Sequence, residues 1–313
     1  MNISALVAGL LLFGSAAAQA EGDFTVSTGP GSGVYTQAVA NMQEVCPDAE
    51  IVEVKSSGAP ENLENCLLGK VTACFVNADQ MWGAKNIEGR DAEVENIKTI
   101  LPFYDNAIHM ISRNPGIVNF SDFNAKVIGT FGGAAITLRV MLAKSERGGA
   151  PVRPAKVVNF DREKDPQKAM LEAWGAGKVD AIVGIGYAPI PWVEKINAQD
   201  AHLVTYDRWN DVKDLSIQNG GFYRMKTIGY KNLDGNASTL TVRTILASAR
   251  NWPANAPETK QIQKLFVCMT KDSTRQTLKS GAGRHFHAFW ITYSPMTDPA
   301  WPWYGNLRPT GKK

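Results

Sequence analysis

The chain has few cysteines and histidines, and none of them stands in a metal-binding motif. Only four of each occur in 313 residues, and no Cys-x-x-Cys pair is present. His285 and His287 would share one face of a strand, but no third ligand lies near them in the sequence, so we expect no metal site. The chain also lacks a Gly-x-Ser-x-Gly elbow, a Ser-x-x-Lys pair and a His-Glu-x-x-His motif, which disfavours a hydrolase. We therefore expect no catalytic residues and no cofactor.

No part of the chain carries a block of one charge. The 33 Lys and Arg residues and the 30 Asp and Glu residues are spread along the sequence and leave a net charge of +3. A nucleic-acid partner requires a basic stripe, so we expect none. The 44% content of hydrophobic residues is enough for ordinary cores, and the length suits two lobes better than one compact domain.

Charged side chains are also missing from the first twenty residues. The run Ala5–Ala18 is apolar apart from Gly and Ser, and Ala18-Gln19-Ala20 is a small-x-small cleavage site. This pattern predicts a signal peptide over 1–20 and a mature chain that begins near Glu21. The alternative, an N-terminal anchor helix, is disfavoured because the apolar run is too short to span a membrane. We predict no other membrane-spanning segment.

Export to an oxidising compartment favours disulfides among the four cysteines. We predict a bond between Cys46 and Cys66, because the end of one helix and the next helix can approach each other across a single strand. Cys74 lies in the apolar run Val71–Val76, which favours a buried free thiol. A bond between Cys74 and Cys268 is the alternative.

The most informative motif is the glycine-rich turn Thr28–Tyr35, which reads Thr-Gly-Pro-Gly-Ser-Gly-Val-Tyr. A short strand precedes it and a helix follows it. Such a turn points free backbone N–H groups and the positive end of a helix dipole at a bound anion. It lacks the Lys-Ser/Thr ending of a P-loop, and its glycine spacing does not fit the dinucleotide fingerprint. The turn therefore predicts a cradle for a small ligand.

Strands and helices alternate along the chain, which predicts mostly parallel sheets with helices on both faces. The predicted strands cover Phe24–Ser27, Glu50–Lys55, Thr72–Asn77, Ile97–Leu101, Ile108–Ser112, Lys126–Thr130, Val157–Phe160 and Ala181–Ile185. The predicted helices cover Tyr35–Val45, Ala59–Leu68, Ala135–Lys144 and Pro166–Trp174. Ligands of such sheets bind at the carboxyl ends of the strands.

A second glycine turn, Gly129–Thr137, again leads from a strand into a helix. Two such turns predict two α/β lobes that face each other across a cleft. We expect the chain to cross between the lobes near Pro102–His109 and to return near Leu203–Asp207.

The remaining part of the chain is predicted to be helical. A helix is expected from Thr239, followed by a loop over Asn251–Pro257 and a second helix over Glu258–Lys279. The Trp- and Pro-rich tail that follows is expected to dock on the body of the protein.

Taken in order, these motifs resemble the TAXI family of TRAP-transporter solute-binding proteins. The matching segments are Phe24–Tyr35, Ser56–Leu63, Leu67–Asp79, Gly129–Thr137, Ala176–Ala181 and Gly186–Pro189. The chain departs from the family at Gly133 and Ala135, where hydroxyl side chains are usual, at Ala59, where Ser is common, and at Asn77–Gln80, where the family has Gln-Ser-Asp.

The resemblance implies an α/β, two-lobed fold of the periplasmic binding protein type (type II), with a ligand cleft between the lobes. Lobe one would comprise 21–104 and 208–313, and lobe two would comprise 105–207. The cleft would be lined by residues of the matching loops: Gly33, Tyr35, Ser57, Gly58, Asn62, Asp79, Gly132, Gly133, Thr137 and Tyr187.

The resemblance also implies a function. A member of this family is a receptor in the periplasm, not an enzyme, which closes on a small organic acid or amino acid and delivers this anionic or zwitterionic ligand to a TRAP-type permease in the inner membrane. A receptor that reports its ligand to a membrane signalling partner is the alternative. An exported hydrolase is a weaker alternative, because the nucleophile and metal motifs are missing.

Several of these residues have a packing role as the alternative to ligand contact. Tyr35 can bind a carboxylate through its hydroxyl or pack at the start of its helix. Asn62 and Thr137 can contact the ligand or bond to the local backbone. Tyr187 can stack on a ligand or fill a core.

Overall fold

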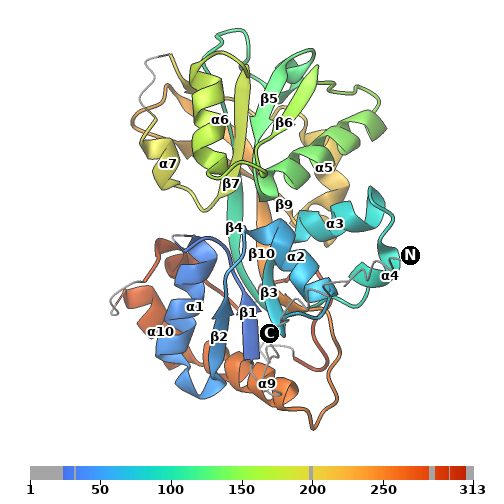
Figure 1. The fold of residues 1–313 in the computed structure, drawn as a ribbon, viewed down its shortest axis with the longest axis vertical. Coiled ribbons are helices and arrows are strands. Elements are labelled where there is room, and N and C mark those ends of the chain that lie inside the picture. Colours follow the sequence, from blue (N-terminus) through green and yellow to red (C-terminus); the bar gives the residue numbers. More distant parts are fainter. Residues whose placement is uncertain (1–23, 32, 197–199, 282–285, 296, 308–313) are drawn as a thin grey trace, which may run out of the picture.

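The computed structural model describes residues 24–31, 33–196, 200–281, 286–295 and 297–307, and the predicted signal peptide lies outside them. One mixed ten-stranded sheet runs through the whole molecule, as Figure 1 shows. Its main path has the order β2-β1-β3-β10-β4-β7-β5-β6, and β8 and β9 pair with β4 and β10. The expected signal peptide and the mature start near Glu21 stay predictions.

Lobe one is built on three parallel strands that follow the predicted pattern. The strands are β1 (Phe24–Ser27), β2 (Ile51–Val54) and β3 (Ala73–Asn77). Its helices are α1 (Val34–Val45), α2 (Ala59–Leu67), α3 (Ala78–Asn86), α4 (Asp91–Val94), α9 (Pro257–Thr270) and α10 (Asp272–Ser280). Short 3-10 turns cover Pro47–Ala49 and Ala288–Thr292.

Lobe two repeats the arrangement with a second set of parallel strands. The strands are β5 (Val127–Thr130), β6 (Lys156–Asn159) and β7 (Ala181–Gly186). The helices are α5 (Gly133–Arg147), α6 (Pro166–Gly175), α7 (Pro191–Glu194) and α8 (Trp209–Val212). Smaller elements are β8 (His202–Leu203) and the 3-10 turns Phe120–Phe123, Lys213–Leu215 and Ile217–Asn219.

Two long antiparallel strands, β4 (Lys98–Ser112) and β10 (Asn236–Ser248), connect the lobes. β4 pairs with β10 in lobe one and with β7 in lobe two. The expected crossing near Pro102–His109 therefore lies inside one continuous strand that replaces two predicted ones. This arrangement confirms the predicted two-lobed α/β fold.

The C-terminal part differs from the prediction at its beginning. The segment from Thr239 is the strand β10 and not a helix, and β9 (Tyr223–Gly229) pairs with it. The run is rich in Thr, Val, Ile and Leu, and β-branched side chains favour a pleated strand between two neighbours. The predicted helix Glu258–Lys279 is divided into α9 and α10 at Lys271.

The return to lobe one differs from the expected position near Leu203–Asp207. There the chain pairs with β4 through β8, and the following helix α8 packs against α5 of lobe two. The structure therefore makes the return along β10, about thirty residues later in the sequence. We accordingly propose β4 and β10, not residues 104 and 208, as the boundaries between the lobes.

The disulfides are Cys46–Cys268 and Cys66–Cys74, so the predicted Cys46–Cys66 bond is wrong. α9 packs against the turn after α1, which brings Cys268 to Cys46. Cys66 near the end of α2 meets Cys74 in the neighbouring β3, so neither a free thiol nor a Cys74–Cys268 bond is present.

The aromatic tail docks on lobe one, as expected. Phe289, Trp290 and Tyr293 are fully buried, and the Trp290 indole N–H donates to Asn41 Oδ1 at 2.7 Å. Further along, the Thr99 N–H donates to the Pro302 carbonyl at the start of β4. Among the described helices, none combines the length and apolar character needed to cross a membrane.

Candidate ligand site between the lobes

The carboxyl ends of the parallel strands of both lobes meet at the middle of the molecule. β3 ends at Asn77, which lies opposite Thr244 of β10, and β7 ends at Gly186, opposite Ala107 of β4. The loops after these strands therefore face each other across the crossing strands (Figure 1). This is the place where ligands bind in open α/β sheets.

The first glycine turn packs against the loop 56–58, which we call the second loop. A Cβ atom on Gly29 would lie 3.8 Å from the Cα of Gly58, and a Cβ on Gly33 would lie 3.0 Å from the Pro30 carbonyl oxygen. Gly58 has φ +125°, a conformation that L side chains rarely adopt. The turn and the second loop thus lie side by side at the inter-lobe boundary, and the backbone conformation at Gly58 favours glycine.

Asn62 holds these two loops together with its buried side chain. Its amide group donates to the Thr28 and Phe75 carbonyls, and its oxygen accepts from the hydroxyls of Ser27 and Ser56. These bonds use both amide protons and both lone pairs of the oxygen. We therefore assign Asn62 a positioning role.

The backbone donors of the second loop are satisfied within the loop. The Ser57 N–H donates to the Glu61 carboxylate at 2.7 Å, which lowers the pKa of Glu61, and the Gly58 N–H donates to Ser56 Oγ at 3.0 Å. These two N–H groups are therefore not free to bind an anion in this structure.

A buried polar cluster joins the first helix to both crossing strands. Asn77 Oδ1 accepts hydrogen bonds from the Tyr35 hydroxyl at 3.2 Å, the Asn106 amide at 3.0 Å and the Thr244 hydroxyl at 2.9 Å. The Tyr35 ring stacks on Phe75 at 4.9 Å, and burial raises the pKa of its phenol. Tyr35 thus combines packing with a hydroxyl that lies at the boundary between the lobes.

Asp79 connects lobe one with lobe two. This fully buried carboxylate accepts from the Thr137 hydroxyl at 2.5 Å and from the Tyr223 hydroxyl at 3.2 Å. Burial raises its pKa to about 6, against the opposing effect of these hydrogen bonds. Thr137 therefore bonds across the lobes, which neither of its expected roles included.

The second glycine turn approaches the start of α3. A Cβ on Gly133 would lie 2.8 Å from Gln80 Nε2 and 3.6 Å from Asn77 Nδ2, so a larger residue here would require the Gln80 side chain to shift. Gly132 precedes α5 with φ +57° and its N–H donates to the Asp161 carboxylate at 2.5 Å. An acidic side chain of the same lobe thus occupies one donor of this turn.

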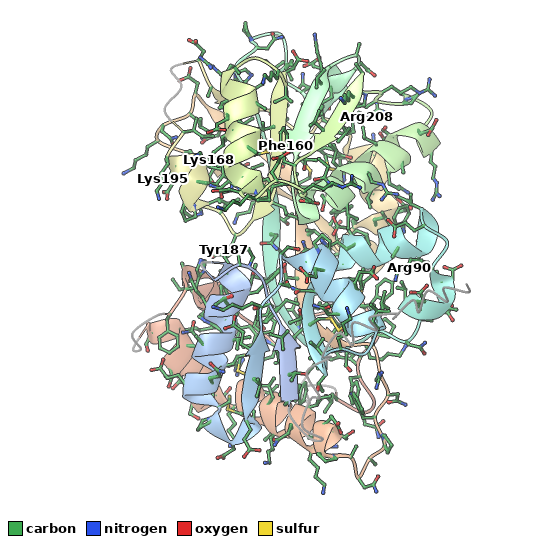
Figure 2. The ribbon with its side chains drawn as sticks, in the orientation of Figure 1. Arg90, Phe160, Lys168, Tyr187, Lys195 and Arg208 are labelled. Atoms are coloured by element: carbon green, nitrogen blue, oxygen red, sulfur yellow. A yellow bond between two sulfur atoms is a disulfide. The ribbon has the colours of Figure 1, made fainter. Side chains whose placement is uncertain are left out.

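Tyr187 closes the other side of the boundary. It follows β7 and lies between the lobes in Figure 2. Its ring makes edge contacts with Tyr104 at 5.6 Å and with His287 at 5.4 Å. Lys226 lies 5.9 Å from its ring centre. Tyr187 therefore brings lobe two into contact with the C-terminal tail.

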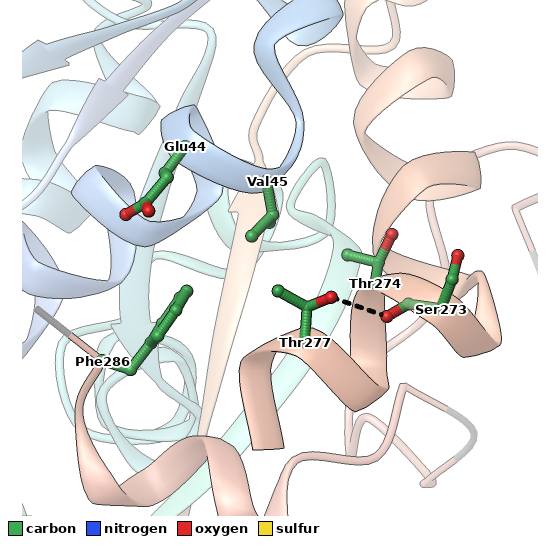
Figure 3. Close-up of a pocket in the computed structure, with 6 residues that line it drawn as sticks. All are labelled: Glu44, Val45, Ser273, Thr274, Thr277 and Phe286. Carbon is green, nitrogen blue, oxygen red and sulfur yellow. Dashed lines mark hydrogen bonds between the residues drawn. The ribbon is translucent and has the colours of Figure 1, made fainter. Parts of the chain in front are cut away.

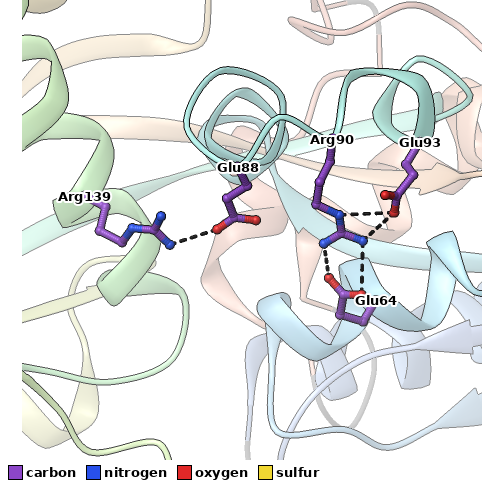
Figure 4. A network of polar contacts seen from close by, with 5 residues as sticks. All are labelled: Glu64, Glu88, Arg90, Glu93 and Arg139. Carbon is purple, nitrogen blue, oxygen red and sulfur yellow. Dashed lines mark hydrogen bonds and ion pairs between the residues drawn. The ribbon is translucent and has the colours of Figure 1, made fainter.

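The lobes also touch directly through α3 and α5, which we call the α3–α5 contact. A Cβ on Gly83 would lie 3.3 Å from Ile136 and 3.4 Å from Val140, so the two helices approach closely. Figure 4 shows the ion pair between Arg139 of α5 and Glu88, with N–O distance 2.8 Å, beside the Arg90 network of lobe one. One hydrophobic core continues from α3 into α5.

A cavity of about 270 Å³ lies away from this boundary, between the end of α1 and α10 (Figure 3). Glu44, Val45, Ser273, Thr274, Thr277 and Phe286 line it. No group of three or more His, Cys, Asp or Glu side chains is arranged to hold a metal ion in the part of the chain that the structure describes.

No protein-family model and no curated protein matches the chain. It is similar to the solved structure of the alkanesulfonate-binding protein SsuA from Xanthomonas axonopodis pv. citri bound to MOPS, with 14% identity, 88% of this chain and 86% of that chain covered, and a TM-score of 0.47. Tv2483 bound to L-arginine has 10% identity, 86% and 94% coverage, and a TM-score of 0.49. The substrate-binding protein AbpA from Streptococcus pneumoniae bound to L-arginine has 12% identity, 83% and 90% coverage, and a TM-score of 0.43.

Sequence reasoning missed four polar residues of the boundary. Asn77 and Gln80 were noted only as departures from a motif, and Tyr104 and Asn106 lie on the crossing strand β4. A polar residue at the end of a predicted strand is a usable signal for Asn77. No local signal marks the residues of β4, because its pairing with β10 brings them to the site.

Proposed function

We propose that the protein is a solute-binding receptor that holds a small organic acid or amino acid between its lobes. The observation that carries this proposal is that buried and half-buried polar side chains from both lobes and both crossing strands gather at the inter-lobe boundary. Tyr35, Asn77 and Asp79 come from lobe one, Thr137 comes from lobe two, and Asn106 lies on β4. Such a boundary can surround a small polar ligand without covalent chemistry.

The ligand contacts remain a proposal for the predicted residues. We place Gly33, Tyr35, Gly58 and Ser57 on the lobe-one side of the ligand. From lobe two, the proposal includes Gly132, Gly133, Thr137 and Tyr187, while Asp79 links the two sides. We propose that lobe two moves about β4 and β10 to admit the ligand. The α3–α5 contact opposes this movement.

We further propose that the receptor works in the periplasm and delivers its ligand to a TRAP-type permease. The motif resemblance supports this step, and the two disulfides are in line with an oxidising compartment. A gene for such a permease beside the gene of this protein favours transport, whereas a membrane sensor gene favours the signalling alternative. Uptake by cells that carry both the receptor and the neighbouring permease is the direct test.

A thermal-shift screen of the mature protein tests the binding proposal. The protein is unfolded and refolded first, so that any bound ligand is removed, and is then mixed with organic acids, amino acids and sulfonates. A ligand at a hundred times its dissociation constant adds about 2.7 kcal/mol of stability, which raises Tm by several degrees. A folded protein that responds to no compound in the panel would refute the proposal.

A further inference from the structure

The crossing strand β4 contains a one-residue bulge beside the candidate site. Pro102 lies opposite Ile245 and Asp105 lies opposite Arg243, so three steps along β4 correspond to two steps along β10. Such a bulge turns consecutive side chains toward one face of the sheet. Phe103 and Tyr104 accordingly both contact Phe289, with ring centres 6.3 Å and 4.5 Å apart.

The bulge leaves the Tyr104 hydroxyl in an unusual position. The side chain is only 3% exposed, yet its hydroxyl has no hydrogen-bond partner among the described residues. Buried hydroxyls normally have a partner, so a buried one without a partner needs an explanation. Its ring contacts Tyr187 of lobe two, which places Tyr104 at the inter-lobe boundary.

The surroundings of Tyr104 contain a second phenol. Burial raises the pKa of Tyr104 far above its usual range, and the nearby Tyr35 adds to this effect. Tyr35 donates its own proton to Asn77, which leaves its oxygen able to accept, whereas the proton of Tyr104 has no acceptor. A hydrogen-bond acceptor on a bound molecule would give the Tyr104 proton a partner.

We propose that Tyr104 is a ligand-binding residue whose hydroxyl donates to an acid oxygen of the bound molecule. The ligand class is a small carboxylate-bearing molecule, held by neutral donors. This inference rests on the proposed function, since it names the group that the same site recognises. It also adds a residue of the crossing strand to a site that the motifs assign to the loops alone.

Tyr293 offers a matched control for the test. It is also fully buried, and its hydroxyl has no partner among the described residues. Its ring packs against Trp290 at 5.0 Å in the core beneath the tail. Removal of either hydroxyl deletes an unpaired buried group, so neither Tyr104→Phe nor Tyr293→Phe should lower the Tm of the ligand-free protein.

The experiment measures binding by calorimetry for the wild-type mature chain and both variants. The probes are L-glutamate, L-glutamine, glutarate and 1,5-diaminopentane, of which only the last lacks an acceptor oxygen. We expect the wild type to bind at least one acid but not the diamine. Tyr104→Phe should weaken binding of that acid by about 10- to 100-fold, as expected for a lost hydrogen bond to a charged group. Tyr293→Phe should bind like the wild type.

Every other outcome overturns the role of Tyr104, and one of them also bears on the receptor proposal. Equal affinity of Tyr104→Phe and wild type, or binding of the diamine alone, would overturn the role of Tyr104 but leave the receptor proposal in place. Equal weakening by Tyr293→Phe would show a general structural effect and would also overturn it. Failure of the folded wild type to bind any of the four probes would overturn this inference, and the proposed function too if the wider panel also fails.

Discussion

Replacement of Asp79 by Asn should change how the stability of the protein depends on pH. The Asp79 carboxyl is fully buried, and its pKa is raised from an ordinary 3.8 to about 6. A group with a raised pKa contributes its stability fully below pH 3.8 and loses it as the pH rises through about 6. The difference between the two values corresponds to about 3 kcal/mol, since one pKa unit is about 1.4 kcal/mol.

Asn cannot ionise, so it escapes this loss. Its side-chain oxygen can still accept from the hydroxyls of Thr137 and Tyr223. We therefore expect the free energy of unfolding of Asp79→Asn, relative to the wild type, to rise by up to about 3 kcal/mol from pH 3.8 to pH 8. About half of this change should appear between pH 5 and pH 8.

Urea unfolding of both proteins at several pH values measures this difference. Any pH-independent cost of the substitution cancels, because only the change of the difference with pH is compared. Asp48→Asn, at an exposed carboxylate in the turn after α1, serves as the control for removal of one charge. If the free energies of unfolding of the wild type and Asp79→Asn differ by a constant amount from pH 5 to pH 8, the raised pKa of the buried Asp79 carboxyl is refuted.

Three further predictions concern the α3–α5 contact, a buried histidine of β4 and the two disulfides of lobe one. Gly83→Leu should destabilise the protein by about 2 kcal/mol or more, because α5 leaves no room for the side chain. The control, Gly175→Leu on the open face of α6, should not destabilise it. Equal midpoints of urea unfolding for the two variants would contradict the close helix contact. Burial lowers the pKa of His109 to about 3. The free energy of unfolding of the wild type should therefore fall by about 2 kcal/mol between pH 7 and pH 5, a loss that His109→Gln should not show. Urea unfolding that gave the same pH dependence for both proteins would contradict this. Replacing Cys46 and Cys268 by Ser should cost about 5 kcal/mol, because this disulfide has a separation of 222 residues. Removal of the other disulfide, with a separation of 8, should cost about 2 to 3 kcal/mol. Calorimetry that gave the reverse order would contradict the chain-entropy argument.

The parts of the fold that the sequence predicts well are those with local signals. The strand, glycine turn and helix around Thr28–Tyr35 follow from neighbouring residues, and the observed α1 begins one residue before the predicted helix. The helix predicted from Thr239 is wrong because the same apolar run suits a buried strand once β3 and β4 flank it. The signal that decides between the two structures is the pairing partner, which lies more than a hundred residues away in the sequence.

The candidate site divides in the same way. The loop residues Tyr35, Asp79 and Thr137 were expected at the site, and the structure brings them to one inter-lobe boundary, although their ligand contacts stay a prediction. Tyr104 could not be predicted, because its orientation depends on a register shift between β4 and β10. The Cys46–Cys268 bond likewise depends on how α9 packs against lobe one.

The strand order has a consequence for the way this chain is made. β3 pairs with β10 and not with β4, so the first lobe needs residues 236–248 to complete its sheet. During synthesis from the N-terminus, the second lobe emerges in full while the edge of β3 is still unpaired, and such edges are prone to aggregation. The disulfide between Cys46 and Cys268 also cannot form until Cys268 has been synthesised. The lobe that begins the chain is therefore the last to be finished.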